Sequence, residues 1–479
     1  MSISSSLSNA MSGLSAMARS VENVSSNLAN ANVDGYGRRE LVVTSDRFGG
    51  VQISAVQREV DLQVVEDRRK HDAYSAFHQQ TSQFHAVIET AIGQPQEFGS
   101  LAQRVSDLDA ALIQAESRPD LESRLDAVAS AAKSLTIQVQ NISQAVQSER
   151  GRADQQISED VNALTMGLQK IKDLNHAIRV GSPSDVSTLS LLDQRQQVLD
   201  QLSHLVPMKT YARPEGEIAI YTETGTALLD GRVADIEFTA ASGMTPYQSP
   251  TMGLSNLVID GDPVDFSRPN NPFSGGGIAA QFSIRDDLAV TAQAQIDSFA
   301  GNLIDRFQSA SVDPSLGPAD AGIFTDNQSQ YVAINELGLS QRLELNALID
   351  PQQGGSPTKI RTGLNVASGP LLDSTILTNL GESLRASVLP SSTTLGQTAL
   401  SLSGLADIFV TDVSGQKEAG SSEHKYALQY RDSFKAEELA GGVDTDQEMQ
   451  KLLLIENAYA ANARVIQAAD DMLQSLLRI

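Results

Sequence analysis

Apolar residues recur at intervals of seven along both ends of the chain. From residue 443 to residue 479, two sets of positions interleave at the offsets of an a/d seam for about four heptads. These positions are Leu452, Ile455, Tyr459, Asn462, Ile466, Ala469, Leu473 and Leu476, with Leu477 beside the last of them. At the other end the matching positions are Ile3, Leu7, Ala10, Leu14, Met17, Val21, Val24, Leu28 and Ala31.

These two stripes predict a pair of terminal helices. A lone amphipathic helix is marginal in water because nothing covers its apolar face, so we expect the two helices to pair as a coiled coil. The alternative is that each helix packs on the core of one globular domain. Gly35 and Gly37 follow the first helix, and Gly441 and Gly442 precede the last one. This symmetry predicts two hinges at one domain boundary.

Helical periodicity also dominates the region between the ends. The predicted helices span residues 61–92, 98–116, 120–180, 187–205, 278–310, 371–386 and 394–409. Gly151 and Gly167 interrupt the third helix. We expect irregular structure over 311–365 and an exposed polar loop or helix margin over 414–422.

Strand patterns occur in two places. Residues 41–56 read as extended, with a turn at Gly49-Gly50, and a second group of short strands follows Pro207. There, residues 218–222 form a strand pattern, and Asp230-Gly231 and Asp260-Gly261 are hairpin signals. The pattern therefore predicts a mainly α fold with a small inserted β domain.

Three units follow from these composition changes. Residues 1–35 and 443–479 would form a terminal coiled-coil domain, and residues 36–205 and 275–442 a bundle of long helices. Residues 206–274 would form the β domain.

Charge and composition exclude several classes of partner. The chain has 479 residues, with 35 Lys and Arg against 59 Asp and Glu, which gives a net charge of −24. This balance argues against nucleic acid and anionic membranes. Cysteine is absent, which excludes disulfides, thiolate metal sites and cysteine nucleophiles. No apolar run approaches the ~20 residues of a membrane span, so we expect no membrane insertion. The N-terminus lacks the pattern of a cleaved signal peptide, so the protein either stays in the cytoplasm or leaves by a route that reads an uncleaved segment.

Candidate chemistry is sparse. His71, His78 and His85 lie seven apart on one predicted helix, which separates successive rings by roughly 10 Å and prevents two of them from sharing one ion. We expect a semi-polar stripe beside Phe77 and Phe84. The acidic run 260–265 lacks the glycine and glutamate of a calcium loop and is better read as a hairpin turn.

Catalytic patterns are missing from the sequence. It contains no nucleophile elbow, zinc-protease motif, P-loop or dinucleotide fingerprint. Asp193 and Arg195 lie two apart on a helix and do not face each other, so each should pair elsewhere in a structural role. We expect no catalytic residue, no metal and no cofactor.

Residues 26–36 carry the most distinctive motif, Ser-Asn-Leu-Ala-Asn-Ala-Asn-Val-Asp-Gly-Tyr. Its key members are Asn27, Asn30, Asn32, Gly35 and Tyr36. The stretch resembles the N-terminal signature of bacterial flagellar rod, hook and hook-associated proteins, with Ser26 and Val33 as departures. Residues 442–477 resemble the C-terminal signature of the same family.

Internal segments resemble one branch of that family. Residues 56–61 and a second segment that includes Asp193, Gln194 and Arg195 are similar to the hook-associated proteins of the hook–filament junction. The resemblance is clear over 1–210 and 430–479, and a weaker likeness covers 275–310.

The resemblance implies a non-enzymatic structural subunit of the extracellular flagellum. In that family the paired termini form the axial part of a tubular polymer, the helical domain packs outside it and the β domain is outermost. The implied partners are the flagellar hook protein, a second hook–filament junction protein, further copies of the chain, and a cytoplasmic export chaperone at the C-terminal helix.

Other functions remain open from the sequence. A flagellar hook or rod subunit shares both terminal signatures, but the long helical middle is untypical of it. A rod-associated cell-wall hydrolase would need two catalytic carboxylates, and no segment singles out such a pair. A cytoplasmic coiled-coil adaptor is a third candidate.

Overall fold

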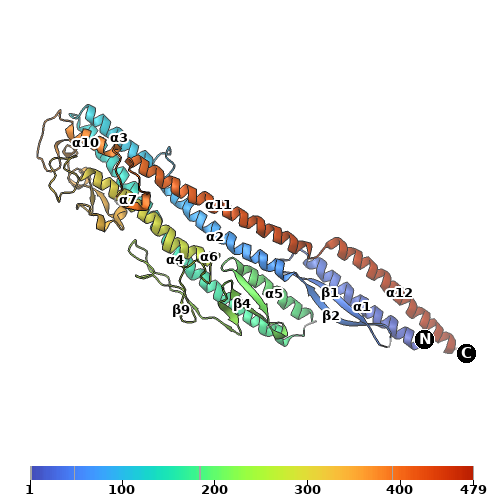
Figure 1. Cartoon of the computed structure of the whole chain (residues 1–479). Helices are drawn as coiled ribbons and strands as arrows, with labels where there is room; N and C mark the ends of the chain where they lie inside the picture. The colour runs from blue at the N-terminus through green and yellow to red at the C-terminus, as the bar shows by residue number, and fades with distance from the viewer. Residues whose placement is uncertain (1–2, 48, 183–184, 391, 478–479) are drawn as a thin grey trace.

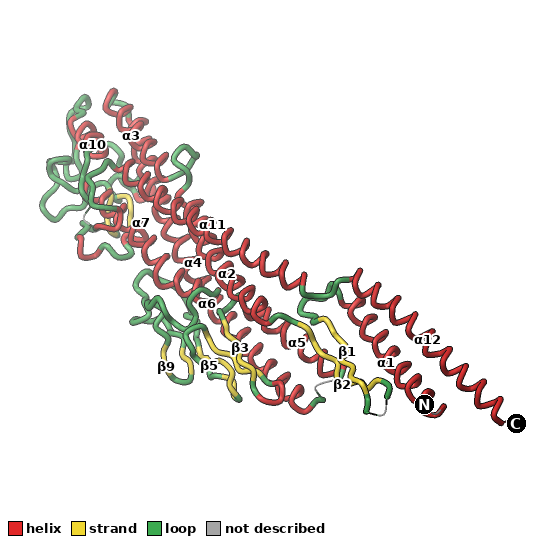
Figure 2. The backbone as a smooth tube through the Cα atoms, turned by 45° about the vertical axis from the view of Figure 1, so that its right-hand side comes forward, coloured by secondary structure: helices red, strands yellow, loops and turns green. Residues whose placement is uncertain are grey.

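The chain forms an elongated helical rod with both termini at the same end (Figure 1). This is a computed structural model, and it describes residues 3–47, 49–182, 185–390 and 392–477. The mainly helical fold with paired termini and a small strand-containing region, predicted from the sequence, is confirmed. Figure 2 shows the same arrangement from a second direction, with the strands grouped beside the helices.

Twelve α-helices are described. They are α1 (Ile3–Asn30), α2 (Leu62–Ile92), α3 (Leu101–Ser117), α4 (Glu122–Val180), α5 (Val186–Ser203), α6 (Gly277–Ser283), α7 (Ala289–Phe307), α8 (Leu339–Arg342), α9 (Lys359–Thr362), α10 (Thr375–Arg385), α11 (Leu402–Ala440) and α12 (Thr445–Leu477). A π-helical segment, η2 (Ile284–Leu288), joins α6 to α7. Short 3-10 turns are η1 (Pro214–Gly216), η3 (Ala333–Asn335), η4 (Pro351–Gln353) and η5 (Thr393–Leu395).

The strands form four small antiparallel sheets. The strands are β1 (Arg38–Ser45), β2 (Val51–Glu59), β3 (Met208–Ala212), β4 (Ile218–Thr222), β5 (Ala227–Asp230), β6 (Arg232–Val233), β7 (Ile236–Glu237), β8 (Val258–Ile259), β9 (Asp262–Pro263), β10 (Phe324–Asp326) and β11 (Leu343–Leu345). β1 pairs with β2, and β10 with β11, while the orders β3-β4-β5-β6 and β7-β8-β9 make the other two sheets. Asp260 and Gly261 both have positive φ between β8 and β9, as the predicted hairpin turn requires.

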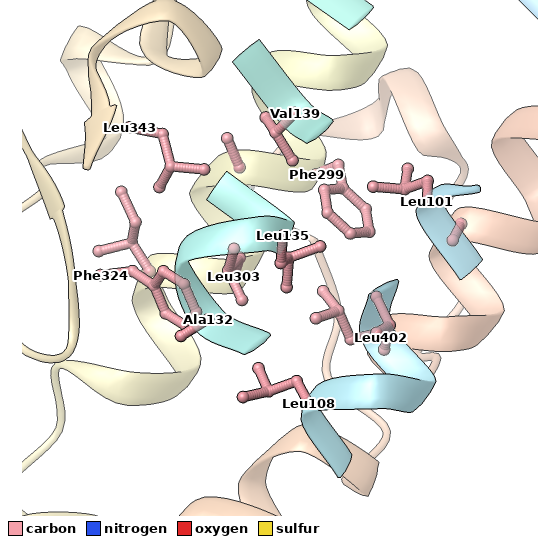
Figure 3. Packing of buried hydrophobic residues seen from close by; sticks show 14 of the residues in the cluster. Leu101, Leu108, Ala132, Leu135, Val139, Phe299, Leu303, Phe324, Leu343 and Leu402 are labelled. Carbon is pink, nitrogen blue, oxygen red and sulfur yellow. The ribbon is translucent and has the colours of Figure 1, made fainter. Parts of the chain in front are cut away.

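Helix α4 runs through both hydrophobic cores of the rod. Its first half packs with α3, α7 and the start of α11, where Leu135, Phe299 and Leu402 are fully buried (Figure 3). The helix passes through both of its glycines without a break. A Cβ on Gly167 would come within 2.6 Å of a methyl carbon of Leu202, so this glycine lets α5 approach closely.

The second half of α4 shares its core with the strands. Ile157, Leu164 and Leu168 of α4 belong to one buried cluster with Leu228, Leu229 and Leu257 of the β region. Arg285 of the π-helical segment adds a buried ion pair with Asp154 at 2.8 Å. The strands of residues 208–263 are therefore fixed to the flank of the helices rather than held by a core of their own.

The prediction for residues 394–422 was wrong. Instead of a short helix followed by an exposed polar stretch, α11 runs without interruption for 39 residues alongside α2. The small and polar residues allow this contact: Gly420 lies over Ser82, whose hydroxyl donates to the carbonyl of Lys417 at 3.0 Å. Lys417 also pairs with Glu89 at 2.6 Å. Local polarity therefore reflected a polar helix–helix contact, not a loop.

Among the described helices, none combines the length and the apolar character that a bilayer span requires.

Candidate functional site

The two terminal helices, α1 and α12, lie side by side and run in opposite directions at the narrow end of the rod (Figures 1 and 2). Gly13 of α1 faces Asn462 of α12, since a Cβ on Gly13 would lie 2.9 Å from the Asn462 amide nitrogen. A glycine at this point allows the two backbones to approach closely.

The predicted seam positions fall into three groups. Ala10, Val24, Ile455 and Ala469 are buried. Leu7, Leu14, Met17, Leu28, Ala31, Leu452, Asn462 and Ile466 are half-buried. Val21, Tyr459 and Leu473 are exposed in the single chain. The side chains of Ile3, Leu476 and Leu477 lie outside the described part of the structure. Whether these positions contact a neighbouring subunit stays a prediction.

A second apolar face of α12 is uncovered in the single chain. Leu453 and Leu454 are 57% and 70% exposed, and Met449, Val465 and Met472 are also exposed. The sequence analysis missed this face. The run Leu452-Leu453-Leu454 is a signal that could have found it, because three consecutive helical residues cannot share one seam.

The hairpin β1–β2 lies along α1. Near the hairpin turn, the backbone N–H of Val51 donates to the hydroxyl of Ser12 at 3.1 Å. Gly49 and Gly50 have φ of +93° and +91°, and both lie against Asn9. At the other end of the hairpin Val56 is buried. The hairpin therefore contacts α1 at both of its ends.

Asn27 holds the beginning of β1. Its fully buried side chain donates to the carbonyl of Arg39 at 3.0 Å and accepts from the Arg39 N–H at 2.9 Å. It also accepts from the Tyr36 hydroxyl at 2.9 Å. Burial raises the pKa of that phenol. Asn27 thus pairs with the backbone as a neighbouring strand would, and it fixes the chain direction after α1.

Asp193 of α5 meets the same segment from the other side. Its buried carboxylate accepts from the Gly37 N–H at 3.0 Å and from Arg58 Nε at 2.8 Å, and it pairs with Arg39 at 3.3 Å. Residues far apart in sequence therefore converge where the terminal helices meet the bundle. We call this contact, formed by Asn27, Tyr36, Arg39, Arg58 and Asp193, the junction cluster.

The other motif residues lie apart from this carboxylate. Arg195 donates to the side chain of Asn175 at 2.9 Å, and its burial, together with Arg58 and Arg69, lowers the pKa of its guanidinium to about 10. It also donates to the Gly216 carbonyl at 2.8 Å. Asp193 and Arg195 therefore have different partners, as their two-residue spacing predicts.

The remaining signature positions have local roles. Gln194 and Asn32 are exposed, and Asn30 donates to the carbonyl of Ser26 at 2.8 Å. Gly35 has φ of +78° and lies against Gln197, where a Cβ would come within 2.9 Å of that side chain. Its carbonyl accepts from Arg58 at 3.0 Å.

A second group of charges links α2, α5 and the end of α11. Arg68 pairs with Asp72 at 2.9 Å, with Asp200 at 2.8 Å and with Glu438 at 2.6 Å. Arg69 adds a contact to Asp200 at 2.7 Å. The sequence analysis named none of these residues. The Arg68-Arg69 doublet in a chain of strong negative charge is the signal that was available.

The first turn of α12 is tied to the hairpin. Glu448 is almost fully buried and pairs with Arg38 at 3.0 Å. A cavity of about 640 Å³ adjoins this region, between the loop at residues 31–36 and the end of α11. The Arg38–Glu448 pair therefore fixes the first turn of α12 against the hairpin.

The contacts described here position helices rather than assemble a reaction centre. Burial lowers the pKa of His71, His78 and His85, which lie along α2. In the described part of the chain, no three His, Asp or Glu side chains are grouped so that they could hold one metal ion.

Family models match three stretches of the chain. A model of the flagellar hook-associated protein FlgK helical domain covers residues 86–312. A flagella basal body rod model covers 7–36, and a C-terminal model of the basal body rod FlgEFG proteins covers 440–479. The chain resembles flagellar hook-associated protein 1 in its central helical region and flagellar rod proteins at both ends. The matched ends contain most of α1 and all of α12, and the central match spans α3 to α7.

Curated relatives carry the same family name. Flagellar hook-associated protein 1 of Escherichia coli K12 is 23% identical over 59% of this chain and 52% of its own length. The protein of Salmonella typhimurium is 26% identical over 48% of this chain and 44% of its own. The chain therefore spans about half the length of these two relatives. The Bacillus subtilis protein is 21% identical over 98% of this chain and 97% of its own.

A solved structure of the flagellar hook junction protein FlgK from Burkholderia pseudomallei is also similar. It aligns at a TM-score of 0.43 and 17% identity, over 54% of this chain and 46% of that one.

Proposed function

We propose that this chain is a structural subunit of the bacterial flagellum that forms the junction between hook and filament and performs no catalysis. The observation that carries this proposal is the match of residues 86–312 to the helical domain of hook-associated protein FlgK. A flagellar hook or rod subunit is the second candidate, because rod-protein models match both ends of the chain. The match of residues 86–312 to the FlgK helical domain favours the junction role over this second candidate.

The arrangement suggests how such a subunit would work. We propose that the terminal helices form the axial part of a tubular assembly, with residues 206–274 as an outer β unit on the helical body. The contact of β1–β2 with α1 supports placing residues 36–59 with the terminal unit. The junction cluster would then set the angle between the axial part and the body.

The exposed face of α12 supports self-association. Leu453, Leu454 and Met472 present apolar surface that the described chain leaves about half or more exposed. Neighbouring subunits in a tube would bury it, together with the seam positions predicted from the sequence. Before assembly, the same helix is the proposed site of a cytoplasmic export chaperone.

The remaining partners and the location follow from the same proposal. The subunit would leave the cell without a cleaved signal peptide and would contact the hook protein on one side and a second junction protein on the other. It would pass through the cytoplasm only transiently.

Localisation by electron microscopy tests this function. A peptide epitope can be inserted after Gly225, an exposed turn position whose surroundings are open. Immunogold labelling of intact flagella should then mark a narrow band where hook meets filament. Label along the whole hook or in the rod would support the second candidate, and label confined to the cytoplasm would contradict both.

A further inference from the structure

The hairpin β1–β2 has two outer edges, and α1 contacts each of them at one point: Asn27 bonds to the N–H and C=O of Arg39 on β1, and Ser12 accepts from the N–H of Val51 on β2. Its eight-residue and nine-residue strands pair with each other, and no other described strand pairs with either of them. Each strand therefore points the backbone N–H and C=O groups of its outer edge away from the pair. Such an edge is a template for another strand, and proteins usually block it with lysine, proline or a covering element.

Neither lysine nor proline is present in these strands. Between Leu41 and Val56 the charged residues are Asp46 and Arg47, whose charges cancel. Val43 and Ile53, which are opposite each other in the register, are 48% and 36% exposed. This stretch of the hairpin therefore presents a neutral and partly apolar surface, whereas the charged residues of the two strands lie at the base of the hairpin: Arg38, Arg39, Glu40, Arg58 and Glu59.

The low charge of residues 41–56, which we call the neutral strip, indicates which partner can bind to this surface. Each chain carries a net charge of −24, so two copies repel each other except where the local charge is close to zero. The strip is also continuous with α1, since the hairpin lies along that helix. A second copy of this chain is therefore the partner that the surface fits.

Side chains of α1 hold the hairpin at two points within the single chain. Asn27 bonds to the backbone of Arg39 at its base, and Ser12 bonds to Val51 near its turn. A preorganised edge loses little conformational entropy when another strand is added.

We propose that the free edge of β1 in one copy pairs with the free edge of β2 in the next copy. This proposal rests on the tubular assembly proposed above. A tube that joins two unlike structures needs all its subunits to point the same way, which requires contacts between unlike surfaces. Pairing of like edges would instead relate two copies by a two-fold axis and reverse every second subunit.

Cysteine cross-linking tests the pairing in assembled flagella, because the natural chain contains no cysteine. Thr44→Cys places a thiol on β1, and Gln52→Cys places one on β2. Each variant is expressed alone, and the two are also expressed together, in cells that lack the natural gene. Sheared flagella are then treated with a short bismaleimide. The double variant in one chain is the positive control, because Thr44 and Gln52 are opposite each other within the hairpin.

An interchain dimer is expected in the mixed sample and should be lost when either variant is expressed alone. Met166→Cys, on an exposed position of α4, should give no dimer and controls for random collision. A mixed sample that assembles at hook ends without a dimer would overturn the pairing. A dimer formed equally by Thr44→Cys alone would also overturn it, in favour of two-fold pairing. Absence of the natural chain from hook ends would instead overturn the proposed function.

Discussion

At the scale of single residues, Asp193 has the most consequential contacts. Its carboxylate accepts hydrogen bonds from the side chains of Arg39 and Arg58 and from the backbone N–H of Gly37. A buried carboxylate with such partners is stable only while they remain, and removal of one member leaves uncompensated charge. The junction cluster therefore depends on Asp193 more than on its neighbours in sequence.

The substitution Asp193→Asn tests this dependence. It removes the negative charge and leaves two guanidiniums in a buried site, so we expect the free energy of unfolding to fall by about 3–5 kcal/mol. Urea unfolding of the purified chain, followed by circular dichroism, measures it. Gln194→Ala is the matched control, because this neighbour is exposed and should change stability by less than about 0.5 kcal/mol. Equal midpoints for both variants would contradict the assigned role.

The sequence predicted part of this cluster. The Asn-rich stretch that ends in Tyr36 was singled out because asparagines stop helices, and the spacing of Asp193 and Arg195 excluded a contact between them. Arg39 and Arg58 were not singled out as site residues. They lie 154 and 135 residues from Asp193 in the sequence, respectively. Local periodicity carries no information on contacts over such separations.

At the scale of elements, the contact between α2 and α11 contains many polar side chains. Beyond Val413, Ala427 is the one fully buried hydrophobic residue described on α11. Histidines fill much of the seam: the His71 ring stacks on Tyr430 and Phe434, and His424 lies at hydrogen-bond distance from Ser75. Ring stacking and hydrogen bonds of half-buried histidines therefore take the place of aliphatic packing along this part of the contact.

This seam predicts a pH dependence of stability. Burial lowers the pKa of His71, His78 and His85 below the unfolded value of about 6.5, so the unfolded chain binds protons first as pH falls. Their contribution to stability is present at neutral pH and is lost as pH falls below about 6.5. Urea midpoints compared above and below this pH should drop in the natural chain. A variant with all three replaced by glutamine should drop less, and an equal drop would contradict the prediction.

The pair of terminal helices, α1 and α12, should separate and unfold more easily than the rest of the rod. Its buried hydrophobic residues are few and small, with Ala10, Val24, Ile455 and Ala469 as the fully covered members. Such burial hardly offsets the entropy of ordering two long helices. Hydrogen exchange on the monomer should therefore be fast over residues 5–30 and 450–475 and slow over 125–178 in α4. Equal protection in both regions would show that the pair is stable without a neighbouring subunit.

The observed bounds of α4 and α11 show which helices the hydrophobic pattern of the sequence can predict and which it cannot. The long apolar periodicity of α4 predicted that helix almost to its ends, although the helix contains two glycines. The same reasoning failed for α11, because its surface against α2 consists of small and polar residues rather than an apolar stripe. Hydrophobic periodicity finds helices that bury aliphatic side chains and misses those held by polar contacts.

At the scale of the whole molecule, we expect the end of the rod that carries both termini to be the end that associates. There, α12 has large apolar side chains on more than one side: Ile455 is buried, while Leu453 and Leu454 are exposed. Large apolar side chains exposed in a cluster are expected at interfaces.

Neighbouring residues of α12 should therefore respond in opposite ways. Leu453→Ala with Leu454→Ala should leave the monomer folded, with an unchanged circular dichroism spectrum, but should prevent filament growth. Ile455→Ala is the matched comparison, because it removes a buried side chain and should weaken the pairing of α12 with α1 in the monomer. The amount of protein in the medium must be measured with both. Loss of secretion in the leucine variant would assign these residues to export, and normal motility would refute their role in assembly.

The central claim is that this chain connects the hook to the filament, and deletion of its gene tests that claim most directly. Electron micrographs of the deletion strain should show complete hooks without filaments, and flagellin should accumulate in the medium. Expression of the natural chain from a plasmid should restore the filaments. Filaments of normal length on the hooks of the deletion strain would contradict the account.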